Sequence, residues 1–164
     1  MNRIFLVCIL MVSLPITAGI VRAEGDKHHG DSITLGPDLL ALLQAEMREI
    51  TVGVQKIPVA IAQGDWETLA QTSESIRSSY IMARSLTEEQ KQVLKLNLPA
   101  RFKLLDSAFH ERAGKLVNAA QARDFELASY HYSRLIESCA QCHSLYASEK
   151  FTGFGNAEEH GHQH

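Results

Sequence analysis

Cysteine, proline and aromatic residues are all scarce in this chain of 164 residues. Its three cysteines are too few for a framework of several disulfides. Proline occurs 4 times, aromatic residues make up 7% of the chain, and no segment alternates apolar and polar residues as a half-buried strand does. The longest apolar run, 4–14, is soon broken by Pro15 and Gly19 and is too short to span a membrane comfortably. These absences favour a single all-helical domain.

The N-terminus nevertheless has the features of a secretory signal peptide. Arg3 precedes the apolar run, and small residues surround an expected cleavage site after Ala23. Cys8 lies inside the run rather than at its end, which argues against a lipoprotein cysteine. We therefore expect residues 1–23 to be removed on export to the periplasm, with an uncleaved membrane anchor as the alternative.

Positive charge is in deficit as well. The chain has 16 Lys and Arg residues against 19 Asp and Glu residues, a formal net charge of −3. Removal of residues 1–23 takes away Arg3 and Arg22 and no acid, so the exported chain has a formal charge of −5. This balance argues against a nucleic-acid partner and favours a protein partner that carries a basic patch.

The most informative motif lies near the C-terminus, where the sequence reads Cys139-Ala140-Gln141-Cys142-His143. The pattern C-x-x-C-H is the attachment signature of a c-type haem. Two thiols three residues apart on a helix share one face, so both can add to the vinyl groups on one edge of a porphyrin. The histidine that follows can ligate the iron. The motif thus predicts one covalently attached haem c per chain.

Two other interpretations of the motif stay open at the level of sequence. A thioredoxin-like redox pair also has the pattern C-x-x-C, but it belongs to a βαβ context for which this sequence has no strands. The motif could also match by chance in a loop that happens to carry cysteines. Once Cys8 is removed, however, the chain holds just the two cysteines that a haem needs.

Helical periodicity and capping residues divide the rest of the chain. Residues 24–36 are polar and contain glycine, and we expect them to be a flexible lead-in. A first long helix is predicted from Pro37 to Gly64, with a kink at Pro58. A second helix is predicted from its N-cap, Asp65, to about residue 82.

Three more helices are predicted after residue 86. Thr87 and Gln90 form a capping-box pattern that opens a short helix over 88–97. A third long helix follows Pro99, and Asp124 caps the last one. The side chains predicted to face the core recur at spacings of three and four: Leu40, Leu43, Met47, Ile50 and Val54; Trp66, Leu69, Ser73, Ile76 and Tyr80; Phe102, Leu105, Phe109, Ala113, Leu116 and Ala120; Ala128, Tyr132, Leu135, Cys139, Cys142 and Tyr146.

Four long amphipathic helices with short connections predict an antiparallel four-helix bundle, with a short extra helix between the second and third. The domain is expected to span residues 37–152, with the haem bound on the last helix. Residues 153–164 are expected to be a disordered tail that contains histidines.

This arrangement resembles the cytochrome c-prime superfamily, over residues 37 to about 152. The resemblance rests on a four-helix domain with C-x-x-C-H on its final helix and on a long first helix that carries Met47. It implies one of two chemistries. In the five-coordinate branch the iron binds nitric oxide or carbon monoxide, whereas in the low-spin branch a methionine of the first helix ligates the iron and the protein carries electrons.

Two departures from the gas-binding branch favour the electron carrier. Ala147 stands where gas-binding members usually have a basic residue, and Leu43 stands where they tend to have an arginine. The aromatic residue that they carry next to the basic one is matched by Tyr146. The resemblance makes Met47 the candidate distal ligand, and Arg48 and Arg101 are only guesses for partners of the haem propionates.

Alternatives to Met47 as the iron ligand remain. A methionine on an apolar helical stripe is often core filler, and His110 is a second possible ligand. Met82 is expected near the end of the second helix, away from the iron, and His131 is expected on the surface. The histidines of the two chain ends are weak candidates for metal binding: His28, His29, His160, His162 and His164.

The sequence-based hypothesis is therefore an exported mono-haem electron carrier that is not an enzyme and that exchanges electrons with unidentified redox proteins. A gas-binding protein and a structural module whose haem completes the core are the alternatives. By resemblance, a homodimer is also expected.

Overall fold

The computed structural model describes residues 33–154, and within this range every regular element is helical. The elements are α1 (Pro37–Gln63), α2 (Trp66–Arg77), α3 (Met82–Ser85), α4 (Glu88–Asn97), α5 (Ala100–Ala122), α6 (Phe125–Tyr146) and a 3-10 turn, η1 (Thr152–Phe154). The predicted signal peptide, most of the lead-in and residues 155–164 of the tail lie outside the described residues. The all-α fold class is confirmed for the part of the chain that is described.

The first helix begins and ends at the predicted residues. Pro37 opens α1 with its fixed backbone angle, and Asp38 places a carboxylate near the positive end of the helix dipole. Gly64 ends the helix in the left-handed region at a φ of 66°, where its N–H donates to the Ile61 carbonyl at 3.1 Å. Pro58 stays inside the helix, which continues through it.

The capping predictions are confirmed at three other helices. The Asp65 side chain accepts a hydrogen bond from the Thr68 N–H, and Asp124 accepts one from the Leu127 N–H. Thr87 forms the predicted capping box at the start of α4. These contacts lie within three residues along the chain, which is why the sequence predicts them well.

The predicted end of the second helix is wrong. The helix α2 ends at Arg77 rather than near residue 82, because Ser79 adopts a left-handed conformation with a φ of 65°. Met82 instead begins α3, so two short helices rather than one lie between α2 and α5.

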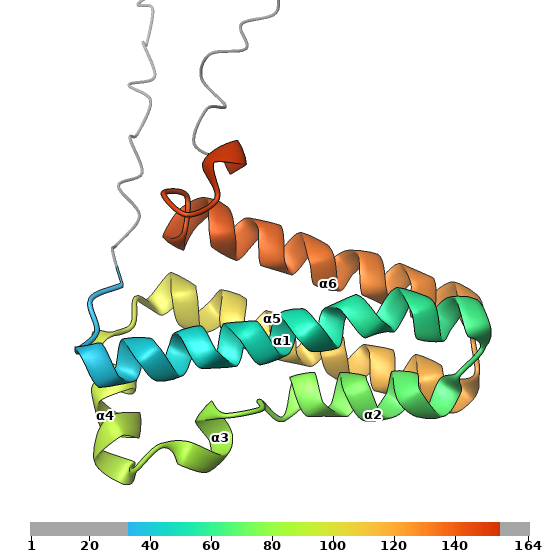
Figure 1. The fold of residues 1–164 in the computed structure, drawn as a ribbon, viewed down its shortest axis with the longest axis horizontal. Coiled ribbons are helices and arrows are strands. Elements are labelled where there is room, and N and C mark those ends of the chain that lie inside the picture. The colour runs from blue at the N-terminus through green and yellow to red at the C-terminus, as the bar shows by residue number, and fades with distance from the viewer. Residues whose placement is uncertain (1–32, 155–164) are drawn as a thin grey trace, which may run out of the picture.

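The long helices pack as neighbours in chain order (Figure 1). The helix α2 packs extensively on α5 and α5 on α6, α1 packs along α2, and α1 contacts α6 much less. The core that these helices share consists of Ile57, Ala60, Ile61, Leu69, Ile76, Ala113, Leu116, Ala119, Ala120, Ala128 and Leu135. Four of these side chains are alanines of α5 and α6, whose small size lets the two helices approach closely.

The first helix is rotated relative to the prediction. Leu39 and Glu46 are buried, whereas Leu40 is 40% exposed and Met47 is 37% exposed. The buried face is therefore turned by about one residue, or 100°, from the predicted stripe over this first half. Ile50 belongs to both faces and is buried as predicted.

The other predicted stripes hold better. Leu69, Ser73 and Ile76 of α2 are buried, and so are Phe102, Ala113, Leu116 and Ala120 of α5. On α6 burial is complete at Ala128 and Leu135 but only partial from there to the end of the helix. Among residues 33–154 there is no helix long and apolar enough to cross a membrane.

Candidate functional site

The C-x-x-C-H motif lies in the last two turns of α6. The helix continues to Tyr146, and the Ala147 N–H donates to the His143 carbonyl at 2.9 Å to close it. Cys139 and Cys142 are half-buried and free, not joined in a disulfide. Since they are three residues apart on an intact helix, both thiols project from one side of α6.

The surroundings of the two thiols argue against a thioredoxin-like pair. Burial raises the pKa of Cys139, and it also raises the pKa of Cys142 to about 11, with further contributions from the charges of Asp106 and Cys139. Redox-active dithiols need the opposite, a thiol whose pKa lies below its ordinary value, because the thiolate is the attacking species. At neutral pH these two cysteines are protonated.

His143 is held by the segment that follows α6. The ring of Phe151 stacks on its imidazole, with ring centres 4.4 Å apart and planes 18° from parallel. The Phe151 N–H donates to the Ala147 carbonyl at 2.9 Å, so a single turn brings the chain back onto the motif. Burial and the charge of Lys150 lower the pKa of His143. The neutral imidazole that results is the form that ligates metals.

The end of α6 is also tied to α5. The rings of Phe102 and Tyr146 meet edge to face with their centres 5.3 Å apart, and Phe102 is buried. The C-x-x-C-H end of α6 therefore packs against the first turn of α5. Tyr146 was predicted to face inward, and it is half-buried.

His110, the alternative ligand, has both ring nitrogens turned to protein groups. Its Nδ1 lies 2.7 Å from the Ile76 carbonyl oxygen and its Nε2 lies 3.6 Å from Asp106. Burial, the largest influence, lowers its pKa. The hydrogen bond and charge of Asp106, the Ile76 carbonyl and the charge of Glu46 outweigh burial and leave the pKa raised. Because the Ile76 carbonyl oxygen can only accept, Nδ1 carries the hydrogen of this bond, and in the neutral ring the lone pair lies on Nε2, beside Asp106.

The remaining candidate ligands are dispersed. Met47 lies on the partly exposed side of α1, and Met82 begins α3. His131 is half-buried rather than a plain surface residue, with its ring edge to face with Tyr130 at 5.2 Å. Arg48 and Arg101, the guesses for propionate partners, are both exposed.

Glu46 is the buried charge that the sequence analysis missed. It is 2% exposed, and its carboxylate accepts hydrogen bonds from the Ser79 hydroxyl at 3.0 Å and from the backbone N–H groups of Tyr80, Ile81 and Met82 at 2.8, 2.5 and 3.0 Å. Burial, the largest influence, raises its pKa, but the four hydrogen bonds together lower it. The carboxylate thereby ties α1 to the turn that ends α2.

Gly53 permits a second close contact between α1 and the same turn. A Cβ atom at this position would overlap the Tyr80 hydroxyl, so only glycine lets the tyrosine ring lie against the helix. Glu46 and Gly53 are seven residues, or two helical turns, apart on the buried face of α1. Neither residue belonged to the predicted apolar stripe, and one carries a charge. Nothing in their own sequence context marks them.

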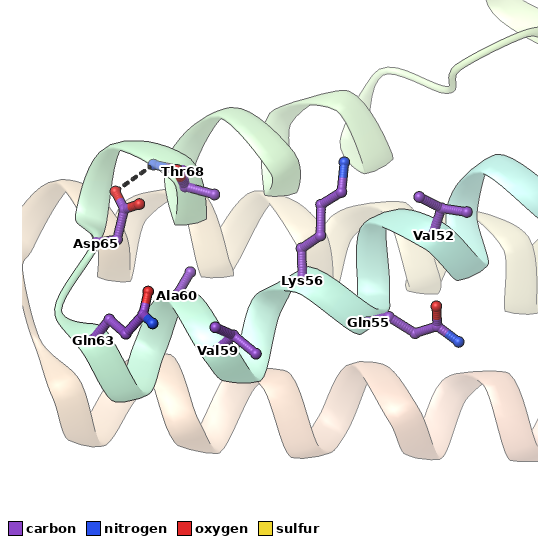
Figure 2. A pocket seen from close by; sticks show the side chains of 8 residues that line it. All are labelled: Val52, Gln55, Lys56, Val59, Ala60, Gln63, Asp65 and Thr68. Carbon is purple, nitrogen blue, oxygen red and sulfur yellow. Dashed lines mark hydrogen bonds between the residues drawn. The ribbon is translucent and has the colours of Figure 1, made fainter.

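A shallow groove lies at the other end of the molecule, between the second half of α1 and the start of α2 (Figure 2). Its only acid, Asp65, is already engaged with the Thr68 N–H at 3.0 Å. Lys56, Val52 and Val59 border it without converging on a common point. Within residues 33–154 no group of three or more His, Cys, Asp or Glu side chains is arranged to hold a bare metal ion. The histidines of the two chain ends lie outside the described residues.

Comparison with known proteins yields no relative. No protein-family model, no curated protein and no solved structure matches this chain.

Proposed function

We propose that this chain is an exported mono-haem c-type cytochrome that carries single electrons. Cys139 and Cys142 hold one haem c covalently, His143 is the proximal iron ligand, and Met47 is the distal ligand. The four long helices form an antiparallel bundle of the cytochrome c-prime type, and the protein is not an enzyme. One observation carries the proposal: two free thiols and an imidazole lie together on the last two turns of one helix.

The donor set fits a covalent haem. Two protonated thiols on one side of α6 suit addition to two vinyl groups, and the adjacent imidazole has the protonation state that iron requires. Some apolar side chains in the first half of α1 and on α6 are partly exposed, and a flat macrocycle bound between them would bury them. Leu40 and Met47 of α1 and Ile136 of α6 are each 37% to 41% exposed.

Each residue of the site then has a distinct role. The cysteines retain the cofactor, and Phe151 holds the plane of the His143 ring by stacking on it. The iron supplies the one-electron chemistry when haem is bound. Phe102 and Tyr146 pack edge to face on the α5 side of the motif.

Two observations support Met47 over His110 as the distal ligand. The nitrogens of His110 face Ile76 and Asp106, whereas the side chain of Met47 takes no part in the buried core. Ligation by a thioether would raise the reduction potential and close the iron to gases. The partial exposure of Met47 also supports the second candidate function, an open iron that binds nitric oxide or carbon monoxide.

An absorption spectrum of the reduced holoprotein, with and without carbon monoxide, separates the two functions. Sharp low-spin bands that the gas leaves unchanged are expected for the electron carrier. A broad high-spin spectrum that shifts with the gas would refute the carrier function in favour of gas binding. Met47→Ala is expected to convert the first spectrum into the second, and the matched variant Leu40→Ala is expected to leave it low-spin. If the Met47→Ala protein stays low-spin, a residue other than Met47 is the distal ligand.

A further inference from the structure

Positive charge is concentrated in one stretch of this acidic chain. Residues 91–105 contain Lys91, Lys95, Arg101 and Lys103 and no acid. Lys91 pairs with Glu88 at 2.6 Å. The other three cations have no carboxylate partner within the described part of the chain. Their charge is therefore available to an external partner.

The same stretch carries the most exposed apolar side chains of the described residues. Leu96 on α4 is 80% exposed and Leu104 on α5 is 70% exposed, and Val93 on α4 is 40% exposed. The helix α4 buries only Leu94. Exposed leucines beside unpaired cations offer a partner both apolar and charged contacts.

The two helices that carry these side chains are adjacent in the chain and in contact. The helices α4 and α5 meet at Leu98 and Pro99, and the Lys103 ammonium group donates to the Lys95 carbonyl at 2.9 Å across the junction. We call the exposed face of residues 91–104 the α4–α5 corner. It lies at the same end of the molecule as the C-terminal end of α6 (Figure 1).

The α4–α5 corner is also coupled to the haem motif through the interior. Phe102 lies between Arg101 and Lys103 in sequence and points inward, where its ring contacts Tyr146 at 5.3 Å between centres. Tyr146 is three residues beyond His143 on α6. A partner bound at the corner would therefore be separated from the motif by the first turn of α5.

We propose that the α4–α5 corner is the docking surface for an acidic redox protein. This inference rests on the proposed function in expecting a redox protein as the partner. It rests on charge complementarity in expecting that the partner's surface is acidic. The exposed leucines supply the apolar contact, and the unpaired cations steer and orient an acidic surface. The net charge of the chain predicts a basic partner, but at contact distance the local charge decides, since charges beyond about 10 Å are screened.

The α4–α5 corner matches a membrane surface less well than it matches an acidic protein. The helix α4 has ten residues and no aromatic side chain, and its exposed large apolar side chains are Val93 and Leu96. Helices that lie in a membrane interface usually have a broad apolar face that includes Trp or Phe. The small apolar area suits a transient protein contact better.

The test is a titration of the isotope-labelled, reduced holoprotein with an acidic plant-type [2Fe–2S] ferredoxin, followed by amide chemical shifts at about 0.1 M ionic strength. Shift changes are expected to cluster on α4 and the first turns of α5, and the binding is expected to weaken as salt is added. Lys95→Glu is expected to weaken binding by roughly tenfold, and Leu104→Ser by a few-fold. Lys56→Glu is the matched control, because it makes the same charge change on the exposed side of α1.

Several outcomes would overturn the proposal. These are shifts that map elsewhere, an equal loss of affinity in the Lys95→Glu and Lys56→Glu variants, or shifts that depend on the concentration of this chain alone. Binding to anionic phospholipid vesicles without binding to ferredoxin would identify the corner as a membrane surface instead. The absorption spectrum of the same sample tests the proposed function separately. A gas-binding spectrum with the expected shifts would refute the electron carrier and keep an acidic-protein docking site.

Discussion

The two ends of the helical array differ in how completely the chain's own side chains fill them. At the end where α1 turns into α2 and α5 into α6, Ile57, Leu69 and Leu116 are fully buried (Figure 1). At the end that carries the C-x-x-C-H motif, α6 is only half-buried, and Leu40 and Met47 of α1 are exposed. The fully buried core thus lies toward the first end, although Val59 and Phe125 stay exposed there, whereas no side chain from Ser138 to Tyr146 is buried.

The connections at the two ends differ in the same way. Gly64 and Arg123 end α1 and α5 in left-handed turns that lead directly into the next helix. At the motif end, α2 and α5 are joined through two short helices, and the buried carboxylate of Glu46 holds the first turn of that connection. The hydrogen bonds of Glu46 thus fix the connection between helices at the motif end, whereas tight turns and apolar packing fix the connections at the other end.

Loss of the two thiols is expected to have the largest effect, and it concerns the motif end alone. Cys139→Ser combined with Cys142→Ser should abolish covalent haem retention, because residues 33–154 contain no other cysteine. Haem staining of the exported protein after denaturing electrophoresis measures this. Ser138→Ala, in the same turn of α6, should retain the stain, and a stained double variant would contradict the attachment by these thiols.

Hydrogen exchange on the haem-free double variant should separate the ends most sharply. Amides of 57–63 and 113–120 are expected to exchange on the order of 100-fold more slowly than those of 138–146, since local stability follows buried apolar contacts. Mass spectrometry of peptides from each segment gives the rates. Uniform protection from exchange along α6 would contradict this difference, because it would mean that the motif end is well packed without a cofactor.

Truncation of a core leucine should show the difference between the two ends as a difference in the free energy of unfolding. In the haem-free protein, Leu116→Ala is expected to lower the free energy of unfolding by about 2–5 kcal/mol, because it leaves a cavity in a fully buried site. Leu40→Ala, at an exposed position, should change it by less than about 0.5 kcal/mol. Urea unfolding of both variants measures this, and similar losses would show that the motif end is packed as tightly as the other.

The smallest expected effect concerns the hydrogen bonds of Glu46 and depends on pH. Glu46→Gln should lower the free energy of unfolding by about 1–3 kcal/mol at pH 7, because it weakens hydrogen bonds from buried donors. Since the folded-state pKa of Glu46 is lowered, its stabilisation is complete above the unfolded pKa and is lost as pH falls through the folded pKa.

The difference between wild type and Glu46→Gln should therefore shrink as the pH is lowered below about 4, near the ordinary carboxyl pKa. Urea unfolding at several pH values tests this, with exposed Glu49→Gln as the matched control. A difference that is constant down to pH 2 would mean that Glu46 does not act as a carboxylate.

Sequence reasoning was accurate where the relevant contacts are local. The caps at Asp65, Thr87 and Asp124 each join residues three apart, so their signal lies within one turn. The end of α2 was misplaced because it depends on Glu46, which lies 33 to 36 residues earlier in the chain. The turn at Ser79 has no signal of its own that outweighs the helical pattern through residue 82.

The candidate site likewise has a part that the sequence predicts and a part that depends on contacts outside one helical turn. The motif from Cys139 to His143 could be found in the sequence, and α6 places it on a helix as predicted. Phe151, which stacks on His143, was missed because the contact depends on a turn after the helix ends. Whether Met47 reaches the iron stays a prediction.

Local sequence was enough to specify where the long helices begin, their N-caps and the face of α6 that carries the thiols, because these depend on residues within a turn of one another. Tertiary packing decided the rotation of α1, which buries Glu46 and exposes Met47. An apolar stripe defines a helical face only to within about one residue, so neighbouring helices select among adjacent rotations. Packing within residues 33–154 also left the α4–α5 corner uncovered, since exposure depends on which other helices lie against a surface.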